Sequence, residues 1–351
     1  MRSNYYLSAF AAMIFSLGVL TLVSCGSDDE EDNVRREETP VTPPDDGKEA
    51  VEVGENVEVF FARAKVYGFV NNETDRTKEH GVVYGTENDI SRLAATGKKV
   101  QASWYDEGTD NRRFSVYLTG LELATTYYFY AYVGDKKSSK LQSFTTRTIK
   151  DTERMAVDLG LPSGTKWANM NVGATKPEEY GKYFPWGESV GYSLSERYTF
   201  SWAKYKWNNG SGYVSKYCTD EQFGDVDGQR ILELDDDAAY VNWGEDWCMP
   251  TREQCKELIA NCDKEWITLN GVNGKVYVSK TNDNAIFFPA GDLRKYGYTT
   301  SVGKFGFYWS STVYEDSQFY AFSLDFAENS TTADNGAWRY FGLNVRPVRR
   351  K

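Results

Sequence analysis

Residues 198–217 carry the clearest candidate chemistry in the chain, because aromatic rings alternate there with lysines and amides in a segment without helical or strand periodicity. An indole or phenol ring offers an apolar face for stacking and a polar group at its edge. Loops held by a rigid scaffold commonly carry binding residues. The pattern predicts a ligand-binding site; the same rings could instead close over the core. The candidate ligand-binding residues are Trp202, Tyr205, Trp207, Trp186 and Glu188.

The residue types needed for most catalysis are scarce. His80 is the only histidine, and it lies outside the aromatic-rich half of the chain. That half therefore lacks Ser–His or Cys–His activation of a nucleophile. Carboxylates such as Glu188 and Asp235–Asp237 remain, and a glycosidase needs two of them about 5–10 Å apart, a spacing that sequence does not supply. We predict no enzyme activity, no catalytic residue and no cofactor, and a structural or solvated role for His80.

Two further residue groups suggest metals or disulfides. Cys218, Cys248, Cys255 and Cys262 lack the close pairs of a zinc site. On one helix, Cys255 and Cys262 would lie about 10.5 Å apart, farther than the ~7 Å that a disulfide allows. Two of the three complete pairings, or four buried thiols, remain open.

Calcium is the other metal to consider. Asp225–Gly228 and Asp235–Asp237 are rich in oxygen ligands but do not have the spacing of an EF-hand loop. We expect them to form a solvated turn and a helix cap, and we predict no metal site.

The N-terminus predicts export. Arg2 precedes an apolar run at 7–23, which is typical of a secretory signal. The residues Leu22-Val23-Ser24-Cys25 resemble a bacterial lipobox, which implies that 1–24 is a signal peptide and that Cys25 carries a lipid anchor binding the membrane. The following GSDDEED resembles the export signal of surface-displayed lipoproteins of the Bacteroidota. This implies a surface-exposed lipoprotein of the outer membrane.

Charge is concentrated just after this cysteine. Of a net charge of −11, residues 26–50 contribute ten acidic and three basic residues, together with Pro40, Pro43 and Pro44. Such a segment buries too little apolar surface to fold, so 25–50 is predicted to be a disordered acidic tether. The rest is only mildly acidic and shows no basic patch, which excludes nucleic acid as a partner.

Residues 51–148 show short alternating runs typical of an all-β sandwich, at 57–69, 81–85, 99–104 and 114–118. The stretch 118–133 with Ser143–Thr146 resembles fibronectin type III domains, and Tyr127 matches the tyrosine corner, whose hydroxyl bonds the backbone upstream. Leu123 stands where the family usually has proline. Period two places Tyr127 and Phe129 in the core and a tyrosine ladder at 128, 130 and 132 on the other face. That ladder is either a stacking surface or cross-strand packing against lysine stems.

Residues 151–351 contain nine of the ten tryptophans. Thr251 and Gln254 form a capping box that begins a helix extending to Cys262, and a shorter helix is expected from Asp235–Asp237 to near Gly244. Five strands are expected, at 275–278, 285–288, 305–310, 320–326 and 343–348.

Six segments of this second region carry a family pattern: 157–168 (VDLGLPSGTKWA), 183–188 (YFPWGE), 236–239 (DDAA), 247–251 (WCMPT), 306–311 (GFYWSS) and 342–349 (GLNVRPVR). On these segments the region resembles the Fibrobacter succinogenes major paralogous domain, a family of secreted and surface modules. The resemblance implies a mixed α+β fold similar to C-type lectins.

Together these patterns predict a multidomain chain with a sandwich at 51–148 and a C-type lectin-like domain at 151–351. Two functions fit such a chain. The first is a non-catalytic adhesion or binding module for glycans or cell-surface proteins. The alternative is a structural or assembly component of the cell envelope, in which the sandwich acts as a spacer.

Overall fold

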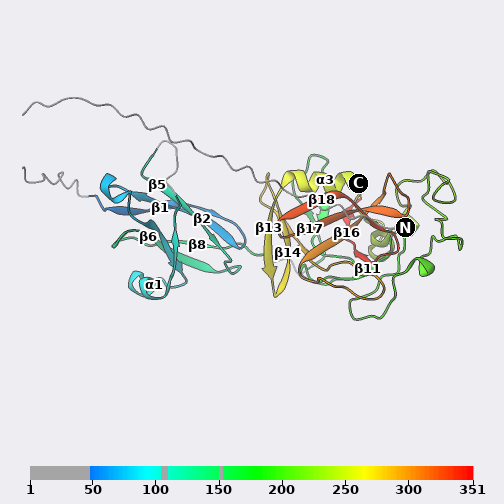
Figure 1. The fold of residues 1–351 in the computed structure, drawn as a ribbon, viewed down its shortest axis with the longest axis horizontal. Coiled ribbons are helices and arrows are strands. Elements are labelled where there is room, and N and C mark those ends of the chain that lie inside the picture. The colour runs from blue at the N-terminus through cyan, green and yellow to red at the C-terminus, as the bar shows by residue number, and fades with distance from the viewer. Residues whose placement is uncertain (1–47, 104–109, 150–152, 351) are drawn as a thin grey trace, which may run out of the picture. The chain divides into compact units, whose positions relative to one another are not determined.

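The computed structural model describes residues 48–103, 110–149 and 153–350. Cys25, the predicted signal peptide and the tether up to residue 47 lie outside them. Residues 48–351 form one compact unit, and its sheets are almost entirely antiparallel (Figure 1). Among the described strands, no sheet combines members from both sides of residue 150. The prediction of a β-rich fold is therefore confirmed.

The first group of strands forms two sheets, with orders β1-β2-β5 and β4-β3-β6-β7, and β8 pairs with β6. Valine and aromatic side chains from both sheets share one core. The single run expected from residue 57 to 69 is two strands, because residues 57–59 fold back to pair with 64–66. The bounds are β1 (Val51–Val59), β2 (Arg63–Val70), β3 (His80–Gly85), β4 (Lys98–Gln101), β5 (Arg113–Thr119), β6 (Thr126–Val133), β7 (Lys136–Lys137) and β8 (Gln142–Thr145), with α1 at Ile90–Thr96 and the 3-10 turn η1 at Glu73–Asp75.

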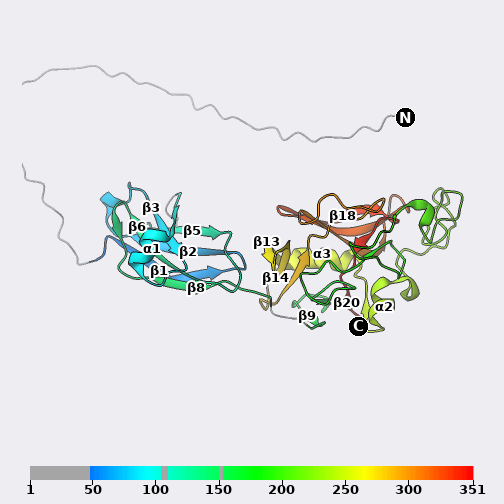
Figure 2. The same ribbon diagram turned by 90° about the horizontal axis from the view of Figure 1, so that it is seen from below.

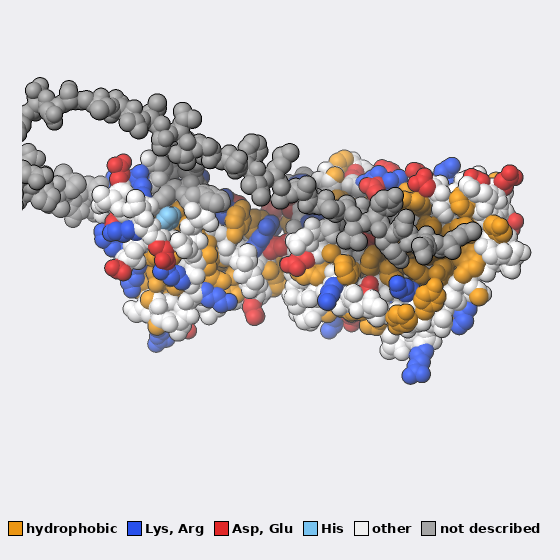
Figure 3. All heavy atoms as spheres, in the orientation of Figure 1, with side chains coloured by type: hydrophobic (Ala, Val, Ile, Leu, Met, Phe, Trp, Pro, Cys, Tyr) orange, Lys and Arg blue, Asp and Glu red, His pale blue; other side chains and the backbone are white. Residues whose placement is uncertain are grey.

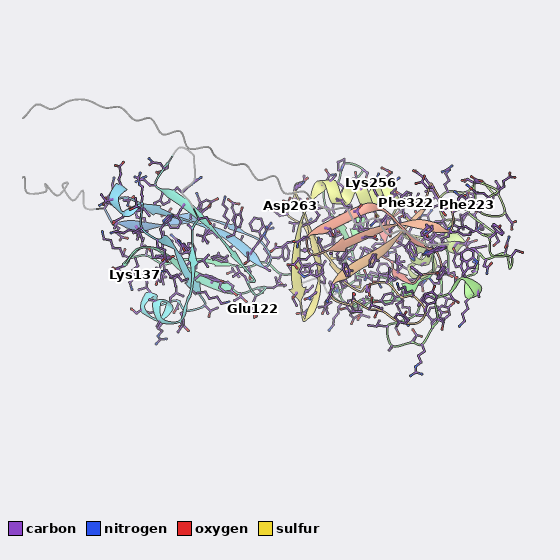
Figure 4. All side chains as sticks on the ribbon, viewed as in Figure 1. Glu122, Lys137, Phe223, Lys256, Asp263 and Phe322 are labelled. Carbon is purple, nitrogen blue, oxygen red and sulfur yellow. The ribbon has the colours of Figure 1, made fainter. Side chains whose placement is uncertain are left out.

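The tyrosine-corner contact is present: the backbone N–H of Glu122 donates to the hydroxyl of Tyr127 at 3.0 Å. The tyrosine ladder on the other face of β6 is covered, since Tyr130 and Tyr132 pack with Leu93 of α1. The ammonium of Lys99 lies 4.2 Å from the Tyr132 ring centroid. Of the two alternatives for the ladder, cross-strand packing is confirmed. Figure 4 labels Glu122 and Lys137; the Lys137 ammonium lies 5.9 Å from the Tyr130 ring.

The single histidine is structural. His80 is buried, its ring lies edge-on to Phe114 with centroids 5.1 Å apart, and its Nδ1 lies 3.0 Å from the Lys78 carbonyl. Of the two roles predicted for His80, structural or solvated, the structure shows the first.

The second group of strands forms three sheets, with orders β12-β20-β10-β9, β11-β19-β16-β17-β18 and β13-β14-β15 (Figures 1 and 2). Two large apolar clusters fill the space between them. The bounds are β9 (Ala156–Asp158), β10 (Lys166–Ala168), β11 (Tyr183–Phe184), β12 (Trp247–Cys248), β13 (Cys262–Leu269), β14 (Val272–Ser279), β15 (Ala285–Pro289), β16 (Phe305–Val313), β17 (Tyr320–Ala327), β18 (Ser330–Trp338), β19 (Leu343–Asn344) and β20 (Val348–Arg349), with 3-10 turns η2 (Trp202–Lys204) and η3 (Leu234–Asp236).

Both predicted helices are present. In α3 (Arg252–Asn261) the Thr251 hydroxyl accepts the Gln254 N–H, and the Gln254 side chain accepts the Thr251 N–H at 2.9 Å, which completes the capping box. The helix ends at Asn261 because Cys262 already begins β13. In α2 (Ala238–Trp243) Asp237 caps the first turn, and Gly244 ends the helix with a φ of +95°.

The strand predictions needed correction at several places. The segment 343–348 is not one strand: β19 and β20 lie in different sheets. Strands β9 to β13 and β18 were not expected: β9 to β12 have only two or three residues each, and neither β13 nor β18 alternates between apolar and polar residues along its length. In β17–β18 a register shift between Ser323 and Asp325 further disrupts the period of two.

The described residues contain no disulfide: Cys218, Cys248, Cys255 and Cys262 are free, and all but Cys248 are buried. They also contain no cluster of three or more potential metal ligands. None of the helices in the described ranges is long and apolar enough to cross a membrane.

Candidate binding surface

Trp186, one of the predicted site residues, belongs to the core. Its side chain is 0 % exposed, and its indole N–H donates to the Ser310 carbonyl at 2.8 Å. Trp309 reciprocates by donating to the Phe184 carbonyl at 2.7 Å. The two indoles thus join the segment after β11 to β16, and the Trp186 ring has no face left for a ligand.

Three other predicted residues are tied into the same packing. The Tyr205 hydroxyl is buried and donates to the Trp186 carbonyl at 2.8 Å. Trp207 donates to the Gly187 carbonyl at 2.9 Å. The Glu188 carboxylate accepts the Lys206 N–H at 3.0 Å; burial raises the pKa of this carboxyl, and that N–H offsets part of the rise. These residues therefore come together mainly as a scaffold.

Asp236 organises the charges beneath this scaffold. Its carboxylate, which is only 4 % exposed, accepts from Lys206 at 2.8 Å, from Lys216 at 2.7 Å and from the Tyr217 hydroxyl at 2.6 Å. Burial alone would raise the pKa of Asp236, but these hydrogen bonds hold it below its ordinary value. Two of the three lysines in the segment 198–217 are thus already engaged by a carboxylate.

Replacing Asp236 by asparagine is expected to lower the free energy of unfolding by about 1–3 kcal/mol at pH 7. Lys206 loses its ion pair with Asp236 and Lys216 keeps only its pair with Glu233, while the half-exposed Lys206 is partly screened by water. Because the folded pKa is depressed, the stabilisation is present above pH ~4 and disappears as the pH falls through the folded value. Urea unfolding between pH 3 and 7 should show the two proteins converging in acid. The exposed neighbour, Asp235→Asn, is the control, and a constant difference at every pH would contradict this account.

The other carboxylates considered for calcium bind backbone N–H groups. Asp227 accepts from Tyr217 at 2.7 Å and from Cys218 at 2.9 Å. Asp237 accepts from Ala239 at 2.8 Å and, through its second oxygen, from Met249 at 2.8 Å. The predicted cap role of Asp237 is confirmed, and its carboxylate also joins α2 to β12.

Two buried arginines fasten the long loops to the sheet. Arg339, which follows β18, donates to the Lys216 carbonyl at 3.0 Å and to the Tyr217 carbonyl at 2.6 Å. Arg294 donates to the carbonyls of Ser193 and Glu196, both at 2.7 Å. Since each guanidinium binds carbonyls of a segment far away in sequence, the loops at 193–217 are held in fixed positions.

Trp202, the remaining predicted site residue, is only partly buried and contacts other aromatic rings, of which Phe319 is also partly exposed. Its half-buried ring lies 5.5 Å from Phe319 and 6.1 Å from Tyr340. Further rings continue the contact series: Phe319 and Trp338 are 6.1 Å apart, and the cross-strand pair Tyr320 and Trp338 is 4.4 Å apart. We define the aromatic patch as Trp202, Phe223, Phe319, Tyr320, Trp338 and Tyr340.

Five of these six rings are partly exposed, whereas Tyr340 is buried. Hydrophobic side chains gather over the C-terminal part of the chain in Figure 3. Contiguous apolar surface of this kind marks interaction sites in soluble proteins.

Sequence reasoning missed five of the six patch residues. They come from the loop at 223, from the start of β17 and from the end of β18, which only the fold brings together. The sequences Phe319-Tyr320 and Trp338-Arg339-Tyr340 could have indicated these residues. They lie at the start of β17 and at the end of β18, which pair with each other in one hairpin.

The residues that the structure describes thus form a β-rich protein, built mainly of antiparallel sheets, with a partly exposed aromatic patch.

No family model and no curated protein matches the chain. Two solved structures are similar to part of it, both of the sensor domain of the anti-sigma factor RsgI4 in Pseudobacteroides cellulosolvens. One has 21% identity, covers 28% of this chain and 94% of that chain, and has a TM-score of 0.22. The other, a solution structure, has 19% identity, covers 29% and 78%, and has a TM-score of 0.23. Likeness at this level supports no conclusion about function.

Proposed function

We propose that this chain is a non-catalytic lipoprotein of the outer cell surface that binds neutral glycans through the aromatic patch. In this proposal Cys25 carries the anchor and residues 25–50 form the tether. The region 51–148 is a fibronectin type III-like spacer. The region 151–351 is a lectin-like module of the Fibrobacter succinogenes major paralogous type. The motifs at each of these positions support the assignment.

The observation that carries the binding proposal is the partial exposure of so many adjoining rings. Large aromatic side chains are highly buried on average, and here Trp202, Phe319 and Trp338 are each partly exposed and lie next to one another. The C–H face of a pyranose can stack on such a ring, while the hydroxyls of Tyr320 and Tyr340 can bond to sugar hydroxyls.

The charges near the patch favour a neutral ligand over an anionic one. Arg339, which adjoins Trp338, is fully buried and directs its guanidinium to backbone carbonyls. Lys216 and Lys206 are bound to Asp236. These three cations thus have internal partners, and ring stacking is the chemistry that we propose for the patch.

Alanine at Trp202 or Trp338 is expected to weaken glycan binding about tenfold or more each, because a central aromatic anchor contributes about 1–2 kcal/mol or more. Electrophoresis through gels that contain soluble starch, β-1,3-glucan, xylan or galactomannan identifies the polysaccharide, and calorimetry then measures the affinity. Tyr117→Ala is the matched control, since this ring is 53 % exposed on β5 and lies outside the patch.

Unchanged affinity in both patch variants, with melting temperatures showing that they are folded, would reject the aromatic patch as the binding site. If the wild-type protein binds none of the polysaccharides, the glycan proposal fails. The role of an assembly component of the cell envelope would then be favoured, with the patch covered by a constant protein partner.

A further inference from the structure

A two-residue hairpin turn borders the aromatic patch. Lys295 and Tyr298 exchange backbone hydrogen bonds, each 3.2 Å long. The two residues between them have positive φ angles, +52° at Tyr296 and +91° at Gly297. Positive φ at both central positions is the mark of a type I′ turn, which matches the twist of the flanking strands.

Tyr296 is an unfavourable residue for its position in this turn. The first central position of a type I′ turn strongly favours asparagine, aspartate or glycine, because a larger side chain with positive φ crowds its own backbone. Burial does not compensate for this strain, since Tyr296 is 54 % exposed. Backbone strain that packing does not explain is concentrated at functional sites in proteins.

The backbone of this turn is fixed beside the patch. The Tyr296 N–H donates to the Phe200 carbonyl at 3.1 Å, and Arg294 exchanges two backbone hydrogen bonds with Gly342 at 2.8 and 2.9 Å. The Tyr296 ring centroid lies 6.5 Å from that of Tyr340, and their hydroxyls are 3.4 Å apart. Through Tyr340 the Tyr296 ring adjoins Trp202 and Trp338.

We propose that Tyr296 contacts the ligand, extending the aromatic patch by one ring, and that its strained conformation is retained because it presents this ring to a sugar. The inference rests on the glycan-binding function proposed above. The pair of tyrosine hydroxyls suits a hydroxyl-rich ligand, because each can both donate and accept a hydrogen bond. An exposed ring beside that pair suits the C–H face of the same sugar.

The test is Tyr296→Asn, which installs a residue that the turn prefers. Relief of strain is expected to raise the melting temperature by about 2–4 °C. Loss of the ring is expected to lower the affinity for the polysaccharide that the wild-type protein binds by about tenfold. The matched control is Tyr298→Asn in the same turn. Tyr298 is 53 % exposed and its φ is not positive, so its replacement should leave both quantities nearly unchanged.

Each outcome separates this inference from the function on which it rests. If the wild-type protein binds no polysaccharide in the gels, both fail. If it binds and Tyr296→Asn binds equally well, the contact is refuted while glycan binding stands. If Tyr296→Asn melts at a lower temperature, Tyr296 has a packing role and the strain argument is overturned. A higher melting temperature together with weaker binding, seen in Tyr296→Asn alone, supports the inference.

Discussion

Replacement of Arg346 by methionine is expected to reduce the free energy of unfolding by about 3–5 kcal/mol. Arg346 lies between β19 and β20, is 0 % exposed, and donates to Asn171 Oδ1 at 2.8 Å, to the Ala168 carbonyl at 3.2 Å and to the Phe287 carbonyl at 2.8 Å. Burial lowers the pKa of Arg346 to about 10. Methionine fills similar space but leaves three buried acceptors without a donor, and each unsatisfied group costs about 1–3 kcal/mol.

Urea denaturation of the wild type, Arg346→Met and Arg346→Lys measures this effect. Lysine is not expected to rescue, because an ammonium cannot reproduce the planar fork that reaches three separate acceptors. Arg349→Met is the control, since Arg349 lies on the surface in an ion pair with Asp246, and surface pairs contribute about 0–1 kcal/mol. A stability of Arg346→Met equal to that of the wild type would show that solvent satisfies these acceptors.

Trp186→Ala is expected to destabilise the fold by about 3–5 kcal/mol, the range found when a large aromatic side chain is removed from a core. The ring packs edge-on against Tyr217 at 5.2 Å, and the Arg339 guanidinium lies 4.6 Å from its centroid. Trp186→Phe keeps a ring but loses the hydrogen bond to Ser310, which leaves a buried carbonyl unpaired and costs about 1–3 kcal/mol.

Melting temperature and urea unfolding distinguish this core role from the ligand contact that the sequence predicted for Trp186. Trp202→Ala serves as the comparison, because that ring is only half-buried and its loss should destabilise much less. If Trp186→Ala kept the wild-type stability and lost only glycan binding, the core role would be wrong.

Local features of the fold were predictable because they depend on neighbouring residues. The capping box at Thr251, the cap at Asp237 and the tyrosine corner at Tyr127 each need partners only a few residues away. Alternation likewise located β3, β5, β6 and β15. Strand β13 was missed because it follows α3 without a turn, and no breaker residue separates the two.

The candidate binding surface was predictable only in part, since its members meet through long-range packing. Trp202 was found because its own segment is rich in rings, whereas Trp338 and Phe319 become its neighbours only when β17 and β18 pair. The burial of Trp186 and Tyr205 could not be predicted either, because a binding loop and a loop packed on a core can have the same composition of aromatic residues and lysines. The strain at Tyr296 required the backbone angles themselves.

The position of β20 has a consequence for biosynthesis. Val348 pairs with Trp167 of β10 on one side and with Cys248 of β12 on the other, so this sheet joins stretches made about 180 residues apart. Such distant pairing slows folding. A ribosome therefore completes nearly all of this region before this sheet can close.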